Sequence, residues 1–480
     1  MKKKSKWNRM IYLAVIFVLL LLLYLFLKNR NEKAEEAESG GMDVIQMDAS
    51  SIVNFSFKIG DNFAEFSKDG DEWKNQEDSE FPVDQEAVET LLNDLLSFTA
   101  ERKLEDVDGL SEYGLEDPSN TIRLTDESGT ETEILVGSRN QSTGDYYVSL
   151  AEAPNTVYVT ASDLSSILPG SVMELAESEA YPAVSSSDIV EIQVKKARGS
   201  YTLAYEEEEA NWSVTGEDGI SYSAEYQQVS SLASTLSGMV YSGLMDYNAE
   251  DLSVYGLDQP AAEIYIRYKE EIEEEEIEEE EEDSGTSSDS SEEEEEPETV
   301  EKNFTLYVGN QDENGNYYVR TEGSGQVHRV SSESLSSALE NNSVSYWSRE
   351  IGYISMNNLK RVEVSYGGEI RTIERHSEEQ EQEDGSTETE VTYTSGGTLL
   401  DEDKTEDFLN SASGISAQSK DPSLSASETA EITITVETES ETFTVSYTPY
   451  DENFYLASDK EGRPGLVNKN SVSELIEAYQ

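Results

Sequence analysis

The stretch Tyr113-Gly114-Leu115-Glu116-Asp117-Pro118 returns later in the chain as Tyr255-Gly256-Leu257-Asp258-Gln259-Pro260. Each copy follows an amphipathic stretch and precedes an alternating apolar run. An internal repeat decides the architecture of a chain, because each copy is one structural unit that buries its apolar face against its neighbours. The recurrence therefore predicts a repeat protein.

The residues before each copy predict a strand hairpin followed by a helix. In the first unit, residues 52–57 and 63–66 alternate apolar with polar residues and lead to Trp73, as a hairpin requires. Residues 88–95 then carry apolar side chains at i, i+3, i+4 and i+7, the spacing of an amphipathic helix. The second unit repeats this order at 189–194, 201–205, Trp212 and 229–236. We expect each helix to pack on its own sheet.

The repeated Tyr-Gly-Leu-x-x-Pro stretch is interpreted as a structural joint between helix and sheet. Glycine permits a positive φ at a turn, leucine can anchor the turn in the core, and proline suits the start of a strand. A hairpin follows in each unit, at 122–124 with 134–137 and at 264–266 with 304–309. The turn of the second hairpin is replaced by an acidic tract, which we interpret as an insertion in a loop.

A third unit is expected to be divergent or incomplete. Residues 359–364 open it, and 432–436 with 443–445 predict its hairpin. It lacks both the Tyr-Gly-Leu-x-x-Pro stretch and the tryptophan, and Phe408, Leu409 and Ala412 predict only a short, weak helix. The predicted fold class is α+β, with an N-terminal transmembrane helix and three tandem repeats of antiparallel strands, each covered by a helix.

The predicted domain organisation follows from these units. It comprises a cytoplasmic basic segment 1–9, a transmembrane helix 10–27, a linker 28–43, repeat unit 1 at 44–180, repeat unit 2 at 181–348 with a disordered acidic insertion 270–301, and a divergent repeat unit 3 at 349–480 with an acidic insertion 376–390.

Residues 10–27 are uncharged and predict a membrane span. A helix of this length covers about 27 Å, close to the thickness of the hydrocarbon core. Five basic residues precede it, which favours a cytoplasmic N-terminus. We therefore expect a single-pass protein of the cell membrane whose C-terminal region is extracytoplasmic, in a Gram-positive bacterium.

Composition excludes several classes of function. The 480 residues include 102 acidic and only 33 basic residues, a net charge of −69, which argues against binding to nucleic acid. There is no cysteine, so disulfides and thiolate metal sites are excluded. The two histidines, His328 and His376, are too few for a multi-histidine metal site and are expected at the surface.

Candidate chemistry is sparse. The acidic tracts are expected to be disordered and to attract divalent cations or a basic partner only weakly. Asp312 to Asn316 superficially matches a calcium loop, but its glycine stands at the wrong position, so we interpret it as a hairpin turn. In the pairs Tyr146-Tyr147 and Tyr317-Tyr318, strand alternation predicts one exposed ring per unit. No catalytic, cofactor-binding or metal-binding residue is assigned, and binding residues stay open.

The order of elements in each unit resembles the repeats of the bacterial domain of unknown function 4340 family. This order is hairpin, tryptophan, helix, Tyr-Gly-Leu-x-x-Pro, strand, Val-Gly and Tyr-Tyr-Val. The resemblance runs from about residue 44 to the C-terminus. It implies a membrane-anchored or exported protein that accompanies ABC-type transporters of the gliding-motility kind, and it implies no catalytic residue.

Two functions are kept open at this stage. The first is a non-enzymatic, membrane-anchored, extracytoplasmic accessory or scaffold protein, without cofactor, that partners an ABC-type transporter and contacts the lipid bilayer through residues 10–27. The alternative is a cell-envelope module that binds wall polymer through exposed tyrosines or through cations bridged by the acidic loops.

Overall fold

The computed structural model describes residues 41–60, 62–118, 120–208, 210–271, 299–381, 387–426 and 429–479. These fall into two compact units. Unit 1 runs to Glu179 and takes in Gly243–Ala249 and Gly325–His328, and unit 2 contains the remainder. The predicted ranges 44–180, 181–348 and 349–480 each contain one large sheet, and their boundaries stay predictions.

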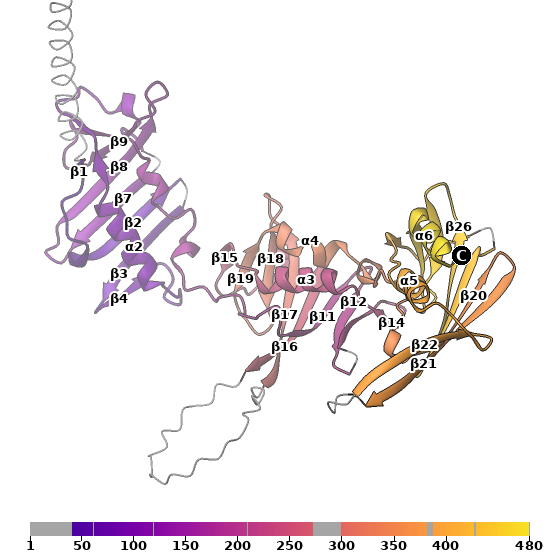
Figure 1. Cartoon of the computed structure of the whole chain (residues 1–480). Helices are drawn as coiled ribbons and strands as arrows, with labels where there is room; N and C mark the ends of the chain where they lie inside the picture. Colours follow the sequence, from indigo (N-terminus) through magenta and orange to yellow (C-terminus); the bar gives the residue numbers. More distant parts are fainter. Residues whose placement is uncertain are drawn as a thin grey trace, which may run out of the picture. The chain divides into compact units, whose positions relative to one another are not determined.

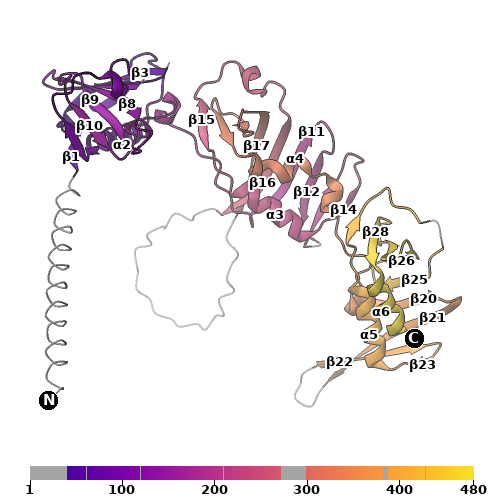
Figure 2. The same ribbon diagram turned by 90° about the horizontal axis from the view of Figure 1, so that it is seen from above.

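Antiparallel strands dominate the fold (Figures 1 and 2). A small sheet pairs β1 (Met42–Asp43) with β5 (Thr99–Ala100). Three large sheets contain eight, nine and nine strands. The first sheet consists of β2 (Ile52–Ile59), β3 (Asn62–Asp69), β4 (Glu72–Asn75), β6 (Arg102–Leu104), β7 (Asn120–Asp126), β8 (Glu131–Arg139), β9 (Tyr146–Leu150) and β10 (Val157–Thr160).

The other two large sheets follow in chain order. The second consists of β11 (Ile189–Lys196), β12 (Tyr201–Glu206), β13 (Asn211–Thr215), β14 (Ser221–Ser223), β15 (Gly243–Asp246), β16 (Ala262–Glu271), β17 (Thr299–Gln311), β18 (Tyr317–Thr321) and β19 (Val327–Val330). The third consists of β20 (Leu359–Tyr366), β21 (Glu369–Glu381), β22 (Thr387–Ser395), β23 (Thr398–Leu399), β24 (Ser419–Lys420), β25 (Ile432–Thr438), β26 (Thr442–Pro449), β27 (Phe454–Ser458) and β28 (Pro464–Asn468).

All three large sheets share one strand order. The second runs β14-β13-β12-β11-β16-β17-β18-β19-β15, and the third runs β23-β22-β21-β20-β25-β26-β27-β28-β24, so the two match position by position. The first runs β4-β3-β2-β7-β8-β9-β10-β6 and lacks only the outermost strand beyond β4 among the described residues. Of the two alternatives for the third unit, divergent or incomplete, the strand order favours divergent, because the sequence differs from that of the second unit while the topology is the same.

The predicted helix-covered α+β class is also wrong, because the fold is mainly antiparallel sheet. The described residues form five α-helices of nine to twelve residues: α2 (Gln85–Leu96), α3 (Tyr226–Ser237), α4 (Ser332–Glu340), α5 (Glu402–Ser413) and α6 (Lys469–Tyr479). Nine strands about 4.8 Å apart extend over roughly 40 Å. A helix is only about 10–12 Å across with its side chains, so one helix cannot cover such a sheet.

Each large sheet has its own hydrophobic core, to which the helices contribute. In α2 the predicted apolar stripe is buried, and α3 buries the matching residues. Helix α5 is longer than the sequence indicates, with twelve residues, and buries Thr405, Phe408, Leu409 and Ala412. It lies beside α6, whose Val472 and Leu475 enter the same core (Figures 1 and 2).

The repeated Tyr-Gly-Leu stretch forms a turn locked against a strand. Gly114 and Gly256 have φ values of 71° and 69°, and Leu115 and Leu257 are buried, as predicted. In unit 1 the turn packs on Gly137 of β8, where an added Cβ would lie 2.3 Å from the Tyr113 carbonyl oxygen. Gly309 of β17 has the same relation to Tyr255, at 2.2 Å. The turn follows the short strands β6 and β15, so it joins strand to strand and not helix to sheet.

The prediction of a single-pass membrane location needs correction. No helix among the residues that the structure describes is long and apolar enough to cross a membrane. The predicted segments 1–9 and 10–27 lie outside those residues. The last residues of the predicted linker, Met42–Asp43, are not linker, because they form β1. The predicted single-pass membrane location is therefore withdrawn.

Candidate functional site

The tyrosine pairs do not form the predicted exposed surface. All four rings are half-buried. Tyr147 packs edge-on against Tyr113 with 4.9 Å between ring centroids, and its hydroxyl accepts a hydrogen bond from Asn140 Nδ2 at 2.7 Å. Tyr318 packs against Tyr255 in the same way, at 5.2 Å. Tyr147 and Tyr318 therefore pack against the tyrosines of the repeated turn and stabilise its position.

The acidic insertions begin and end within strands. Glu270 and Glu271 pair with Val300 and Thr299 in the β16–β17 ladder. In the third sheet, residues 376–381 of β21 pair with 387–392 of β22. Disorder is thus the wrong expectation for these flanks, and the residues 272–298 and 382–386 between them lie outside the described part of the chain.

The calcium-like stretch is a hairpin turn, as predicted. The Asp312 side chain accepts hydrogen bonds from the backbone N–H groups of Asn314 and Asn316 at 2.9 and 2.8 Å. Its other carboxylate oxygen lies 3.5 Å from Arg329 Nη1. Within the described ranges, no group of three or more histidine or acidic residues is placed to hold a metal ion.

The two histidines differ in environment. His376 is exposed, as predicted, and its Nε2 lies 3.1 Å from Thr394 Oγ1. His328 lies on β19 and is 1% exposed, so the surface prediction is wrong for it. Burial lowers the pKa of His328 to about 4, against a smaller opposing effect of Glu179, so this imidazole is neutral at pH 7.

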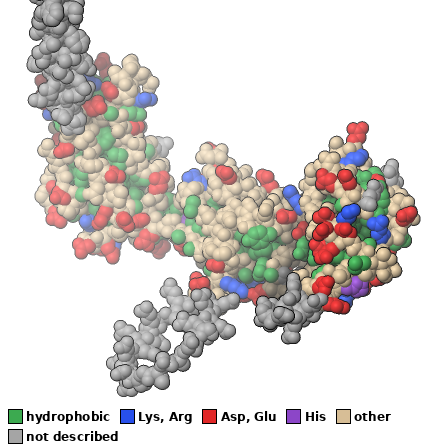
Figure 3. Space-filling view, in the orientation of Figure 1, with side chains coloured by type: hydrophobic (Ala, Val, Ile, Leu, Met, Phe, Trp, Pro, Cys, Tyr) green, Lys and Arg blue, Asp and Glu red, His purple; other side chains and the backbone are tan. Residues whose placement is uncertain are grey.

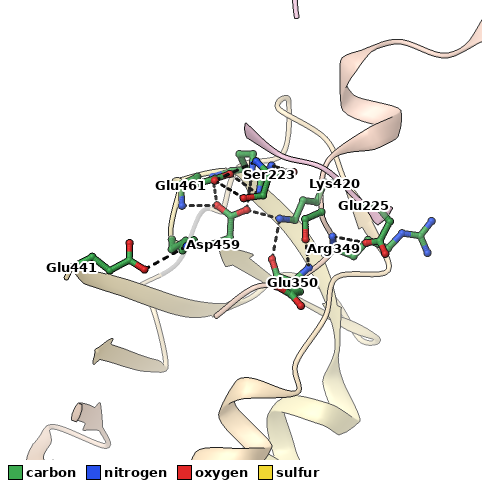
Figure 4. Close-up of polar contacts among 11 residues, drawn as sticks. Ser223, Glu225, Arg349, Glu350, Lys420, Glu441, Asp459 and Glu461 are labelled. Atoms are coloured by element: carbon green, nitrogen blue, oxygen red, sulfur yellow. Dashed lines mark hydrogen bonds and ion pairs between the residues drawn. The ribbon is translucent and has the colours of Figure 1, made fainter. Parts of the chain in front are cut away.

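The most developed polar site lies in unit 2, where the third sheet meets the second (Figure 4). It is built on the loop between β27 and β28. Asp459 closes this loop, because its side chain accepts hydrogen bonds from the backbone N–H groups of Glu461 and Arg463 at 3.0 and 2.8 Å. Gly462 supplies the positive φ of 78° that the tight turn needs.

Three charged side chains of this site are almost completely buried. The side chains of Lys420, Asp459 and Arg463 are 2%, 1% and 4% exposed. Arg463 Nε lies 2.7 Å from Asp459 Oδ2, and Lys420 Nζ contacts the same oxygen. Lys420 also donates to the Glu350 carbonyl oxygen at 3.1 Å. Burial lowers the pKa of Lys420, the charge of Arg463 lowers it further, and Asp459 opposes both effects.

The Arg463 guanidinium connects the two sheets. Its Nη1 donates to the backbone oxygen of Ser223 on β14 at 3.1 Å, and its Nη2 lies 2.7 Å from Glu461 Oε2. The guanidinium carbon lies 5.1 Å from the ring centroid of Tyr222 and 5.5 Å from that of Trp347. Tyr222 lies on β14 of the second sheet and packs against the core of that sheet, to which Trp347 belongs. An arginine of the third sheet is therefore held by aromatic rings of the second.

Further contacts extend this connection along the same edge. Glu461 Oε1 accepts hydrogen bonds from the Ser223 N–H and hydroxyl at 3.3 and 3.0 Å. The Arg349 N–H donates to Glu225 Oε2 at 3.0 Å. We call Lys420, Asp459, Glu461 and Arg463, together with Tyr222, Ser223 and Trp347, the ionic joint.

A cavity of about 480 Å³ opens beside the ionic joint. Asp459 and Arg463 contribute to its lining, together with Glu225, Glu350 and two tyrosines. Tyr226 is 65% exposed and Tyr353 is 59% exposed. Neither tyrosine was selected from the sequence, because neither belongs to a repeated motif.

The sequence signal for the ionic joint is weak. Arg463 and Ser223 are 240 positions apart. The only local indication is the loop itself, Asp459-Lys460-Glu461-Gly462-Arg463, a dense run of charge around a glycine. Such a run is typical of an exposed turn, so burial of its first and last residues was not predictable from it.

Comparison with protein families matches one family profile to the chain twice, in agreement with its internal repeats. The profile of the family described as Domain of unknown function (DUF4340) matches residues 73–260 and again 212–433. Comparison with curated proteins and with solved structures finds no match. The two matches overlap within the second repeat and together span most of the chain, and on this basis the chain belongs to the DUF4340 family.

Proposed function

We propose that the chain is a non-enzymatic accessory or scaffold protein, and that its partner is an ABC-type transporter. The observation that carries the proposal is the ionic joint. A scaffold has to hold its binding surfaces at a fixed angle, and a joint that resists bending serves this purpose. In unit 2 that role falls to Arg463, Asp459 and Lys420.

The energetics of buried charge support a stiff joint. Separating the third sheet from the second would leave Arg463 without Ser223 O and without its two aromatic rings. A hydrogen bond to a charged group is worth about 1.5–3 kcal/mol and a desolvated cation–π contact up to about 2 kcal/mol, and both are lost here, whereas the ion pairs of Arg463 with Asp459 and Glu461 stay within the third repeat. A hinge that must bend freely would not be built around such a cost.

The surface charge supports a partner with basic regions. The chain carries a net charge of −69, and acidic side chains gather over the C-terminal repeat in Figure 3. Complementary charge raises association rates and excludes wrong partners. The transporter as partner rests on the family resemblance, which links such repeats to ABC-type transporters.

Affinity purification tests this function. The tagged full-length chain, incubated with a gently solubilised membrane fraction that contains the transporter, is expected to bring down transporter subunits identifiable by mass spectrometry. The variant Arg463→Ala should recover less of the partner, whereas Arg361→Ala, which removes an exposed ion pair with Glu363, should recover as much as the unmodified chain. Recovery of the chain without any transporter subunit would contradict the proposal.

A further inference from the structure

The cavity beside the ionic joint has the size and rigidity of a binding cleft. Its volume of about 480 Å³ lies within the range of about 300–1,000 Å³ that is usual for ligand sites. Its floor includes Asp459 and Arg463, whose positions are fixed by the buried ion pairs. A ligand would therefore meet a preformed surface and would not have to order it.

The two tyrosines of the cleft are unusually exposed. Tyr226 is the first residue of α3, and Tyr353 lies in the segment that leads into the third sheet. Both line the cavity, although they are separated by more than a hundred positions in the chain. Tyrosine is enriched where proteins bind one another, because it offers a large rigid ring with little loss of conformational freedom.

The charge of the cleft is negative. Lys460 also lines the cleft, but this lysine forms an ion pair with Glu441, with 3.4 Å between Lys460 Nζ and Glu441 Oε1. Asp459 and Arg463 neutralise one another. The carboxylates of Glu225 and Glu350 remain, and in the described part of the chain neither forms an ion pair with a lysine or arginine side chain, although Glu225 Oε2 accepts a hydrogen bond from the Arg349 backbone N–H. Two carboxylates beside two aromatic rings suit a cation.

We propose that this cleft binds a lysine- or arginine-bearing extended segment of the partner protein. The inference rests on the proposed scaffold function and names the place where the partner docks. An arginine of the segment stacks on Tyr226 or Tyr353 and pairs with Glu225 or Glu350. Arginine favours such a site because its planar guanidinium can stack and form paired hydrogen bonds at once.

A binding titration with the full-length chain tests the cleft. The probe is a short fluorescent peptide that alternates arginine with alanine, measured by fluorescence anisotropy at two ionic strengths. A peptide with glutamine in place of arginine is the control for charge. We expect the arginine peptide alone to bind, and to bind more weakly at the higher ionic strength.

Matched variants separate the cleft from the general acidity of the chain. The pair Tyr226→Ala and Tyr353→Ala should weaken peptide binding about tenfold, and Glu225→Gln with Glu350→Gln about threefold to fivefold. Tyr450→Ala and Glu313→Gln remove a tyrosine that is 42% exposed and an exposed carboxylate away from the cleft, and should leave binding unchanged. All four cleft positions lie at the surface or its margin, and unchanged thermal unfolding would confirm that the variants fold.

Two results would overturn this inference. The first is equal binding of the arginine peptide to the tyrosine variant and to the unmodified chain. The second is displacement of the peptide by a neutral wall polysaccharide that itself binds at the tyrosines. Either result leaves the purification experiment untouched, because a transporter that still co-purifies would dock elsewhere on the chain.

Discussion

At the scale of single residues, Arg463 shows how one side chain can connect two sheets. It is 4% exposed and satisfies its donors with Asp459, Glu461 and the Ser223 backbone oxygen. Removing it would leave Lys420 as the only cationic side chain in contact with the buried Asp459 carboxylate among the described residues. The cost of burying charge is recovered only while all partners are present.

We expect Arg463→Ala to lower the free energy of unfolding of unit 2 by about 3 kcal/mol. Urea unfolding followed by tryptophan fluorescence measures this loss, since Trp347 lies against the Arg463 guanidinium. Arg361→Ala is the control, because its ion pair with Glu363 is 44% and 40% exposed and should be worth less than about 1 kcal/mol. Equal losses of unfolding free energy for the two variants would show that the ionic joint stabilises the chain no more than an exposed ion pair does.

Because His328 is buried and neutral, we expect the free energy of unfolding to depend on pH, and one substitution at this position separates its contribution from the others. Burial holds its pKa at about 4 in the folded chain, whereas an unfolded chain has a histidine pKa near 6.5. Between these values the unfolded state binds a proton that the folded state does not. Stability should therefore be fully present above pH 6.5 and fall as the pH drops towards 4, by up to about 3 kcal/mol.

The variant His328→Leu should lose this part of the pH dependence. Unfolding of both proteins at pH 7 and pH 5 gives the comparison, and the difference between the two slopes belongs to His328 because the other titrating groups are shared. Parallel slopes would mean that the imidazole is accessible to protons in the folded chain.

At the scale of elements, the sequence predicted those segments whose pattern is local. The apolar stripes of α2 and α3, the first hairpin β2–β3 and the positive φ of Gly114 follow from spacing and residue type alone. The short strands β6, β15 and β24 were not predicted. They contain two to four residues with little apolar pattern, and pairing with β10, β19 and β28 alone makes them strands.

The site was less predictable than the fold for the same reason. The charged members of the ionic joint, Lys420, Asp459, Glu461 and Arg463, lie in a turn or at a strand end, where the sequence signal is polar and the partner is distant. In the third unit, the weak helix signal and the missing motif left open whether the repeat is divergent or incomplete. The strand pairing, which the sequence does not show directly, has the same order as in the second unit and favours divergence.

The contact between the repeated turn and the Val-Gly strand gives a prediction for two equivalent positions. Gly137→Ala and Gly309→Ala should each destabilise the chain by about 1–3 kcal/mol, because the added Cβ would meet a backbone oxygen at 2.3 or 2.2 Å. Gly109→Ala is the control, since nothing lies within 4 Å of its Cβ. Thermal unfolding of the three variants measures the effect. A harmless change at Gly137 or Gly309 would show that the turn is not held against the strand.

At the scale of the whole molecule, the chain repeats one strand order three times. The buried charged residues of the ionic joint lie between the second and third repeats. The three cores are separate clusters, each centred on one large sheet, and Leu244 of β15 packs into the first. Contacts such as those of Arg463 therefore decide whether neighbouring repeats of unit 2 behave as one body. Both the scaffold function and the cleft depend on this rigidity.

The absence of cysteine from the sequence allows a direct measurement of that rigidity. Spin labels at Glu333→Cys on α4 and Glu474→Cys on α6, both exposed positions, report the distance between the second and third repeats by pulsed electron spin resonance. If the ionic joint holds the two repeats rigidly, the labels give one narrow distance distribution, which broadens when Arg463→Ala is added. A broad distribution in the chain that retains Arg463 would contradict it.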